Sequence, residues 1–333
     1  MTSYLLGLIP SLIFLGTIVI LSALLSWLSS KREGYRCPLT RDLLRAPGHS
    51  LLKRIEDLTI EIDCYAAMMA MMPLFFYASY LTRSYFGVVK ESEHTAIIYG
   101  LGLLALNLYS GKQLRGLLKE RHAYRLGLDC EMAVGQELNN LMSAGYRVYH
   151  DVPAEGFNID HVVVGRNGVF AVETKGRSKP ERGRGSEDAT VVYDGRTLRF
   201  PDWIGRDFLD QAKRQAEWLS RWLAEVVGEP VPVQPVLVIP GWYVERVRRG
   251  DVLVLNGKKD CRFLINQWTH TSLPHDLIQS VSGVLEEVCR DVKPLAYKPS
   301  QRGEASPQQR PRKILGRVMP IRSIDRASTH QSP

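Results

Sequence analysis

Two acids and a lysine that together could bind a divalent metal stand in two neighbouring apolar segments. Asp160 lies in Ile-Asp-His-Val-Val-Val-Gly, and Glu173 and Lys175 end Gly-Val-Phe-Ala-Val-Glu-Thr-Lys. Buried carboxylates must be protonated, paired with a cation or bound to a metal. Two carboxylates leave the other octahedral positions of Mg²⁺ to water, a carbonyl and substrate phosphate. The set therefore predicts a magnesium site, with Lys175 orienting the attacking water or offsetting charge on phosphorus.

These two segments are predicted to be antiparallel strands of one hairpin. The separator Arg-Asn-Gly at 166–168 indicates a type I′ turn with Asn-Gly at its centre. In that register Asp160 faces Lys175, and Glu173 lies diagonally beside Asp160, within about 8 Å. A plain Asp160–Lys175 ion pair with Glu173 at its rim is the alternative to a metal site. The register decides, because a slip of one residue would separate the side chains.

Helices and further strands are expected on both sides of the hairpin. Apolar residues recur at helical spacing over 128–144, and Gly145 stands at the expected stop. Glu131 lies on the same core-facing stripe, so it either snorkels at the helix end or is held there for chemistry. The other expected elements are strands at 146–152, 233–239, 252–255 and 262–265 and helices at 207–227 and 274–290. The order through residue 239 is αβββαβ.

The first 110 residues carry uncharged runs that predict three transmembrane helices, at about 4–28, 64–81 and 95–109. The first run has 25 residues, enough to cross about 30 Å of hydrocarbon at 1.5 Å per residue. A cleaved signal peptide is disfavoured because the positive residues follow this run. The third run is short, and a buried or re-entrant helix is its alternative. Lysine and arginine gather between the first two runs and after the third, which predicts an outside N-terminus and a cytoplasmic C-terminal part.

Composition divides the rest of the chain. Of 333 residues, 43 are Lys or Arg and 35 are Asp or Glu, and most of the net charge of +8 lies in the segment 292–333, where Pro, Ser, Gln and Arg predict a basic disordered tail. This tail could touch anionic lipid or nucleic acid. Five scattered cysteines without a CxxC pair exclude a zinc ribbon and a disulfide framework. The expected organisation is a membrane region at 1–110, a basic juxtamembrane segment at 111–126, an α/β domain at 127–291 and the tail.

The segment 176–200, directly after Lys175, is expected to be a loop. It carries six lysines and arginines, which could follow a nucleic-acid backbone. Four acidic residues are interspersed among them, so an ordinary solvated loop is the alternative.

Four motifs in order resemble the nuclease-related domain family, NERD, which belongs to the PD-(D/E)xK nuclease-like superfamily. They are Gly-x-x-Cys-Glu-x-x-Val at 127–134 and the segments 145–152, 158–165 and 168–175, and the resemblance covers about 127–240. It implies a restriction-endonuclease-like αβββαβ core in which Asp160, Glu173 and Lys175 form the nuclease centre. It also implies that Glu131 is the additional helix acid and Gln211 the glutamine of the following helix. Cys130 replaces the family's usual glycine, and Ile159 the proline of the superfamily name.

The sequence thus predicts a multi-pass membrane protein with a cytoplasmic nuclease-like domain that cleaves phosphodiesters. Mg²⁺ or Mn²⁺ is the expected cofactor, with Asp160, Glu173 and Glu131 as its ligands. The expected partners are nucleic acid, with DNA as the first candidate, and the lipid bilayer. A catalytically silent nucleic-acid-binding module and a membrane scaffold are the alternatives, and the intact Asp160, Glu173 and Lys175 favour the enzyme over the silent module.

Overall fold

A computed structural model describes residues 38–85, 93–182, 185–257, 261 and 272–294, with a few residues of the segment 16–27. Most of the apolar run 4–28 therefore lies outside the described residues. The same holds for the expected strand at 262–265 and for the tail after residue 294.

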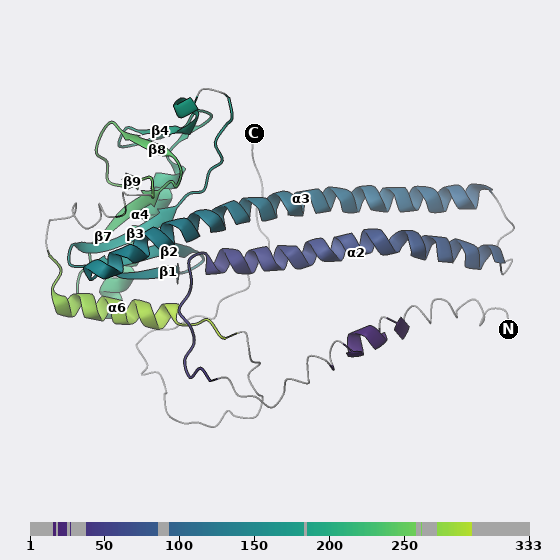
Figure 1. Ribbon diagram of the computed structural model, residues 1–333, viewed down its shortest axis with the longest axis horizontal. Coiled ribbons are helices and arrows are strands. Elements are labelled where there is room, and N and C mark those ends of the chain that lie inside the picture. Colours follow the sequence, from purple (N-terminus) through teal and green to yellow (C-terminus); the bar gives the residue numbers. More distant parts are fainter. Residues whose placement is uncertain are drawn as a thin grey trace. The chain divides into compact units, whose positions relative to one another are not determined.

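A five-stranded sheet forms the centre of the α/β domain (Figure 1). Its strands are β1 (Arg147–Pro153), β2 (Asn158–Gly165), β3 (Gly168–Thr174), β7 (Val233–Val238) and β9 (Leu253–Leu255). Strand order is β1-β2-β3-β7-β9; β1, β2 and β3 are antiparallel neighbours, whereas β7 is parallel to β3 and β9 is parallel to β7. The parallel step from β3 to β7 requires a crossover, and helix α4 (Asp207–Val227) supplies it.

Helices cover both faces of this sheet because its strands are apolar on both sides. Every residue of β3 is buried. Val169 and Ala171 belong to the core that α4 and α6 (His275–Cys289) complete. Phe170 and Val172, on the opposite face, pack with residues from the end of α3 (Glu93–Asn139). The expected αβββαβ order is thus present in a mixed α/β fold.

Two long helices, α2 (His49–Tyr85) and α3, lie side by side as an antiparallel hairpin (Figure 1). The rings of Phe76 and Tyr99 meet edge to face at 5.9 Å, and further along Arg54 pairs with Glu120 at 2.8 Å. Helix α3 runs without a break from the third apolar run through the basic segment 111–126 into the helix of the α/β domain. It ends in a 3₁₀ turn, Asn140–Ala144, and at Gly145, whose φ of 83° confirms the expected stop.

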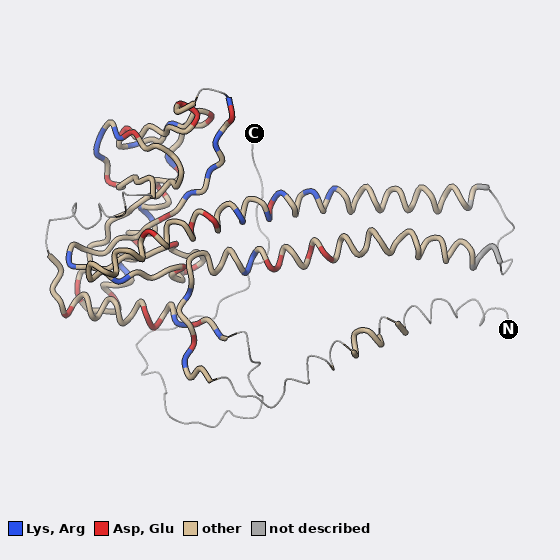
Figure 2. Tube along the Cα trace, viewed as in Figure 1, with Lys and Arg blue, Asp and Glu red and all other residues tan. Residues whose placement is uncertain are grey.

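Among the described helices, one stretch, His49–Leu81 of α2, is long and apolar enough to cross a membrane. Residues 95–109, expected as a separate span, form the first part of α3. Charged residues gather along the halves of α2 and α3 that adjoin the sheet, and the far halves carry almost none (Figure 2). In the far half of α2, Leu74 and Phe75 are 62% and 63% exposed.

The segment 176–200 is more than the expected loop. It contains a 3₁₀ turn (Gly185–Ala189), β4 (Thr190–Tyr193) and β5 (Leu198–Arg199). With β6 (Ile204–Gly205) and β8 (Tyr243–Arg246) they form a second sheet in the order β6-β5-β4-β8. Its inner side chains share a core with residues of α4 and β7, which include Leu209, Ala212 and Leu237.

The expected register of the β2–β3 hairpin is wrong by two residues. Gly165 pairs with Gly168, so the turn consists of Arg166 and Asn167. Gly165 lies under the ring of Tyr146, where a Cβ would come within 2.1 Å of a ring carbon. A glycine within a strand often marks such a close approach, and here Gly165 is the last paired residue of β2. Continued outward, the register places Asp160 opposite Glu173 instead of Lys175. A shift of two residues keeps side chains on their faces, so Asp160 and Glu173 still share one.

Candidate active site

Three donors surround the carboxylate of Glu173, which is the second-last residue of β3 and is 2% exposed. Lys175 Nζ lies 2.5 Å from Oε1, and the amide of Gln211 donates to the same oxygen at 2.7 Å. The amide of Gln215 donates to Oε2 at 2.6 Å. Gln211 and Gln215 stand one turn apart on α4, so one helix face orients both oxygens. The expected Asp160–Lys175 pair does not form, because the lysine is held by the glutamate of its own strand.

Asp160 approaches the same place from β2. The backbone N–H of Thr174 donates to its Oδ2 at 2.6 Å, which ties Asp160 to the residue between Glu173 and Lys175. Burial raises the pKa of Asp160 well above its ordinary value, and the negative charges of Glu173 and Glu131 raise it further. The Thr174 N–H and the charge of Lys175 act in the opposite direction without cancelling the effect. The site thus holds more buried negative charge than its lysine balances.

Glu131 reaches this charge cluster from α3. Its 8% exposure confirms that it faces the interior. Burial, with contributions from Asp151 and Glu173, raises the pKa of Glu131 to about 8, whereas Lys175 lowers it. Glu131 is therefore mostly protonated at neutral pH unless a cation is added to the site.

Asp151, whose charge acts on Glu131, had no expected role. Asp151 is 1% exposed and has a φ of 50°, the positive value that side chains rarely adopt. Arg45 donates to its Oδ2 at 3.0 Å, and Ser50, in the first turn of α2, donates to its Oδ1 at 2.5 Å. The same arginine binds Asp291 at 2.6 Å. Residues ahead of α2 thus hold the edge of the site, a long-range contact without a local sequence signal.

Gln215 is the second residue without an expected role. It lies on the stripe of α4 that also carries Gln211, so the spacing of four residues was its signal. Gln215 is 3% exposed, and its Oε1 is buried without a partner among the described residues. An acceptor therefore stays available beside Glu173 for a water molecule or a protonated acid.

Lys175 marks the accessible side of the cluster, because a quarter of its side chain is exposed. Its Nζ lies 5.7 Å from the centre of the Phe208 ring. Two residues further on, the Arg177 guanidinium lies 5.0 Å from the Phe200 ring and donates to Asp202 at 2.9 Å. The segment that follows β3 thus places two cations, Lys175 and Arg177, beside aromatic rings.

The donor chemistry fits a hard divalent cation. Glu131, Asp160 and Glu173 offer only oxygen, and the raised pKa values of Glu131 and Asp160 show a cluster that gains from added positive charge. Within the described part of the chain, no three His, Cys, Asp or Glu side chains are placed to hold a metal by themselves. Any ion here would take its remaining ligands from water or substrate.

Residues 126–240 match the sequence model of the nuclease-related domain, NERD. The matched range contains all five expected site residues. No curated protein and no solved structure matches the chain. The NERD match supports a nuclease-like function and nucleic acid as the general class of partner, and the mixed α/β fold is consistent with it.

The folded unit extends beyond the NERD domain at both ends. After residue 240, β9 adds an edge strand to the main sheet and α6 completes one of its cores. Before residue 126, Leu43 forms an antiparallel bridge with Val292, next to the Arg45 contacts. A fragment that begins at the NERD domain would therefore lose residues that hold the edge of the site.

Proposed function

We propose that this chain is a membrane-anchored nuclease whose NERD domain hydrolyses phosphodiester bonds of nucleic acid, with DNA as the first candidate substrate. One observation carries the proposal: Asp160, Glu173 and Lys175 meet where β2 begins and β3 ends, with Glu131 close enough to raise the pKa of Asp160. Fold stability does not require buried carboxylates that repel one another, so their juxtaposition favours a functional explanation.

Asp160 and Glu173, with Glu131 as a third acid, are the residues that would hold Mg²⁺ or Mn²⁺. Such an ion would polarise the phosphate and lower the pKa of a bound water. The chain itself supplies orientation: Gln211 and Gln215 fix Glu173, and the Thr174 N–H fixes Asp160. Carboxylates that are already held in place lose less conformational entropy when they bind a cation than mobile carboxylates do.

Lys175 is the proposed catalytic cation. Its ammonium is partly exposed and is held by Glu173, so it can meet a phosphate oxygen without leaving the site. It would offset the negative charge that grows on phosphorus as water attacks. A lysine in this role acts more strongly on the transition state than on bound substrate.

A silent binding module is the second candidate, and one observation favours it. The Lys175–Glu173 pair and the two glutamines already satisfy both oxygens of Glu173 without an ion. A domain that only binds nucleic acid would keep this pair as a structural element. The two candidates differ in metal-dependent turnover.

The deciding experiment measures cleavage by the full chain in nanodiscs. The substrates are labelled single-stranded and duplex DNA and RNA, with Mg²⁺, Mn²⁺ or EDTA. We expect metal-dependent cleavage that the Lys175→Met preparation, purified in parallel, lacks. Binding without cleavage of any substrate in both metals would replace the nuclease by the binding module.

We further propose that the chain crosses the membrane several times and carries the NERD domain in the cytoplasm. The apolar stretch His49–Leu81 and the positive charge of 111–126 support this topology. An impermeant thiol reagent applied to intact cells should label a cysteine introduced at Ser92 and miss one introduced at Gly176. Labelling at Gly176 would contradict the cytoplasmic orientation.

A further inference from the structure

A group of four exposed arginines lies on the second sheet, away from the acidic cluster. Arg196 and Arg199 belong to the β4–β5 hairpin, and Arg248 and Arg249 belong to the loop after β8. We call these four residues the arginine ledge. Blue segments mark this loop in Figure 2.

Pairing between strands brings the two parts of the ledge together. Val192 pairs with Arg199 on one side and with Glu245 on the other, and Tyr193 pairs with Arg246. At the β4–β5 turn, a Cβ placed on Gly195 would lie 2.8 Å from the carbonyl oxygen of Arg249. The turn and the loop are therefore in direct backbone contact, which brings Arg196 close to the loop that carries Arg248 and Arg249.

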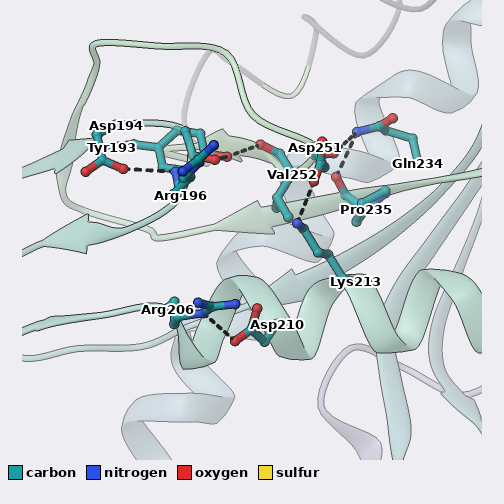
Figure 3. Close-up of polar contacts among 11 residues, drawn as sticks. Tyr193, Asp194, Arg196, Arg206, Asp210, Lys213, Gln234, Pro235, Asp251 and Val252 are labelled. Atoms are coloured by element: carbon teal, nitrogen blue, oxygen red, sulfur yellow. Dashed lines mark hydrogen bonds and ion pairs between the residues drawn. The ribbon is translucent and has the colours of Figure 1, made fainter.

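Hydrogen bonds hold the loop at both ends, and Figure 3 shows those at its end. At its start, Val247 N–H donates to the Tyr193 carbonyl at 2.8 Å. At its end, Tyr193 Oη donates to the Val252 carbonyl at 3.0 Å, and Gln234 donates to the Asp251 carbonyl at 2.9 Å. Such anchoring presents the arginines at reduced conformational cost on binding.

The nearby acids are largely engaged by other groups. Lys213 Nζ lies 2.6 Å from Asp251 Oδ2 (Figure 3). Asp194 accepts from the backbone and hydroxyl of Thr197 at 2.7 Å each, and Arg199 is further away at 3.8 Å. Glu245 is the remaining exposed acid on β8. The ledge therefore keeps a surplus of positive charge.

The position of the second sheet favours nucleic acid over anionic lipid as the negatively charged partner of the arginine ledge. This sheet shares its core with α4 and with the face of β7 that carries Leu237, whereas α3 packs on the opposite face of the main sheet. Trp242, next to β8, donates from Nε1 to the Arg177 carbonyl at 3.0 Å. The ledge is thus joined to the chain that leaves the proposed catalytic strand.

We propose that the arginine ledge binds the phosphate backbone of the nucleic-acid strand that the NERD domain acts on. The inference rests on the proposed function and assigns it a substrate-binding surface distinct from the acidic cluster. Arginine forks match phosphate oxygens, and contacts of this kind are independent of sequence and sensitive to salt. The ledge would supply affinity, and the acidic cluster turnover.

The test uses the full chain in nanodiscs of neutral lipid, with EDTA present so that cleavage cannot interfere. Fluorescence anisotropy of a labelled 30-nucleotide DNA, single-stranded and duplex, gives Kd between 50 and 200 mM salt. The R248E/R249E chain is compared with R214E/R221E, which makes the same charge change on the exposed face of α4. A milder R248Q/R249Q chain and circular dichroism guard against loss of fold.

We expect R248E/R249E to raise Kd about 10-fold or more and to reduce the salt slope by about two, with the glutamine pair intermediate and R214E/R221E near wild type. Equal losses in both charge-reversed chains, or no loss in R248E/R249E, would overturn the ledge. So would ledge-dependent binding to vesicles with 30% anionic lipid that displaces DNA. Because no metal is present, the ledge can be confirmed even if the wild-type chain never cleaves, and cleavage can be found even if the ledge fails.

Discussion

Two apolar regions of this protein, strand β3 and the far half of α2, differ in how their apolar side chains are covered. In β3 every residue is buried by helices on both faces of the sheet. In α2, Leu74, Phe75 and Tyr77 are each more than 60% exposed although α3 lies alongside. The domain completes its own core, whereas the described residues leave the apolar surface of the hairpin uncovered, and a bilayer would cover it.

Charge shows the same contrast in reverse. The hairpin keeps its charges at the surface, where Arg54 and Glu120 are each about 40% exposed and pair simply. The domain gathers two buried acids and one half-buried acid around one lysine, where ionisation is opposed by burial and by repulsion. The proposed catalytic centre thus combines unfavourable electrostatic contacts, whereas the proposed membrane segment exposes apolar side chains.

The largest effect on activity should come from replacing Lys175, the cation that lies among the acids of the site. Lys175→Met removes a preorganised cation, so kcat should fall by roughly 10²- to 10³-fold while nucleic-acid binding changes little. Single-turnover cleavage and anisotropy measure the two quantities. Lys179→Met, an exposed lysine of the same segment, is the control and should cut normally. Equal cleavage by both variants would mean that Lys175 is not catalytic.

A charge placed on the exposed apolar surface tests the other half. Phe75→Arg should oppose membrane insertion by about 3 kcal/mol, the cost of an arginine near the centre of a transmembrane helix. Ile60→Arg is the matched control, because Ile60 has the same 63% exposure but lies in the charged half of α2. The carbonate-resistant membrane fraction should fall only for Phe75→Arg. Identical fractions would mean that both halves of α2 face water.

Metal-linked stability sharpens the contrast between buried and exposed acids. At a Mn²⁺ concentration 100-fold above Kd, binding to one site should stabilise the folded chain by about 2.7 kcal/mol. Asp160→Ala or Glu173→Ala should abolish this gain in a thermal-melting series. Asp210→Ala, which removes an exposed partner of Arg206 on α4, should retain it. Full metal-induced shifts in both site variants would mean that these acids do not bind the metal and would leave the Lys175–Glu173 ion pair as a structural element.

The smallest effect concerns pH and Glu131. Its pKa is raised from 4.5 to about 8, so the folded wild-type chain loses stability relative to Glu131→Gln as pH rises through this range and the difference is constant above it. We expect the variant to gain roughly 2 kcal/mol between pH 5 and pH 9 in EDTA, below the ~5 kcal/mol that the full pKa displacement allows. Glu137→Gln, off the core-facing stripe, is the control. A difference in melting temperature that does not change with pH would contradict a buried, ionisable Glu131.

Sequence reasoning placed the elements of the α/β core because each has a strong local signal. Helix α4 begins and ends at the expected residues, and Gly228 closes it with a φ of 84°. The hairpin register was wrong, yet Asp160 and Glu173 stayed together because the error was an even number of residues. A slip of one residue would have placed them on opposite faces of the sheet. Their shared face was therefore predicted correctly because side chains alternate along a strand, although the turn itself was predicted wrongly.

What the sequence could not predict depends on contacts between distant residues. Strands β5 and β6 have two residues each, too few for a periodic signal, and they exist because β5 pairs with β4 and β6 pairs with β5. Arg45 reaches Asp151 from more than one hundred residues away. The continuity of α3 was missed because its apolar, basic and domain segments differ in composition although all favour helix.

Because α3 is unbroken, the spacing between the proposed membrane segment and the proposed active site depends on helical rotation as well as on length. From Tyr109 to Glu131 the helix rises about 33 Å, and each residue also turns it by about 100°. One residue removed from 111–126 would rotate Glu131 away from the acids around it or twist α3 against α2. A seven-residue change, matched in both helices, nearly restores the angle and alters the height by about 10 Å. Natural length variation in the segment 111–126 should therefore occur in whole pairs of helical turns, because other changes would rotate Glu131 out of the site.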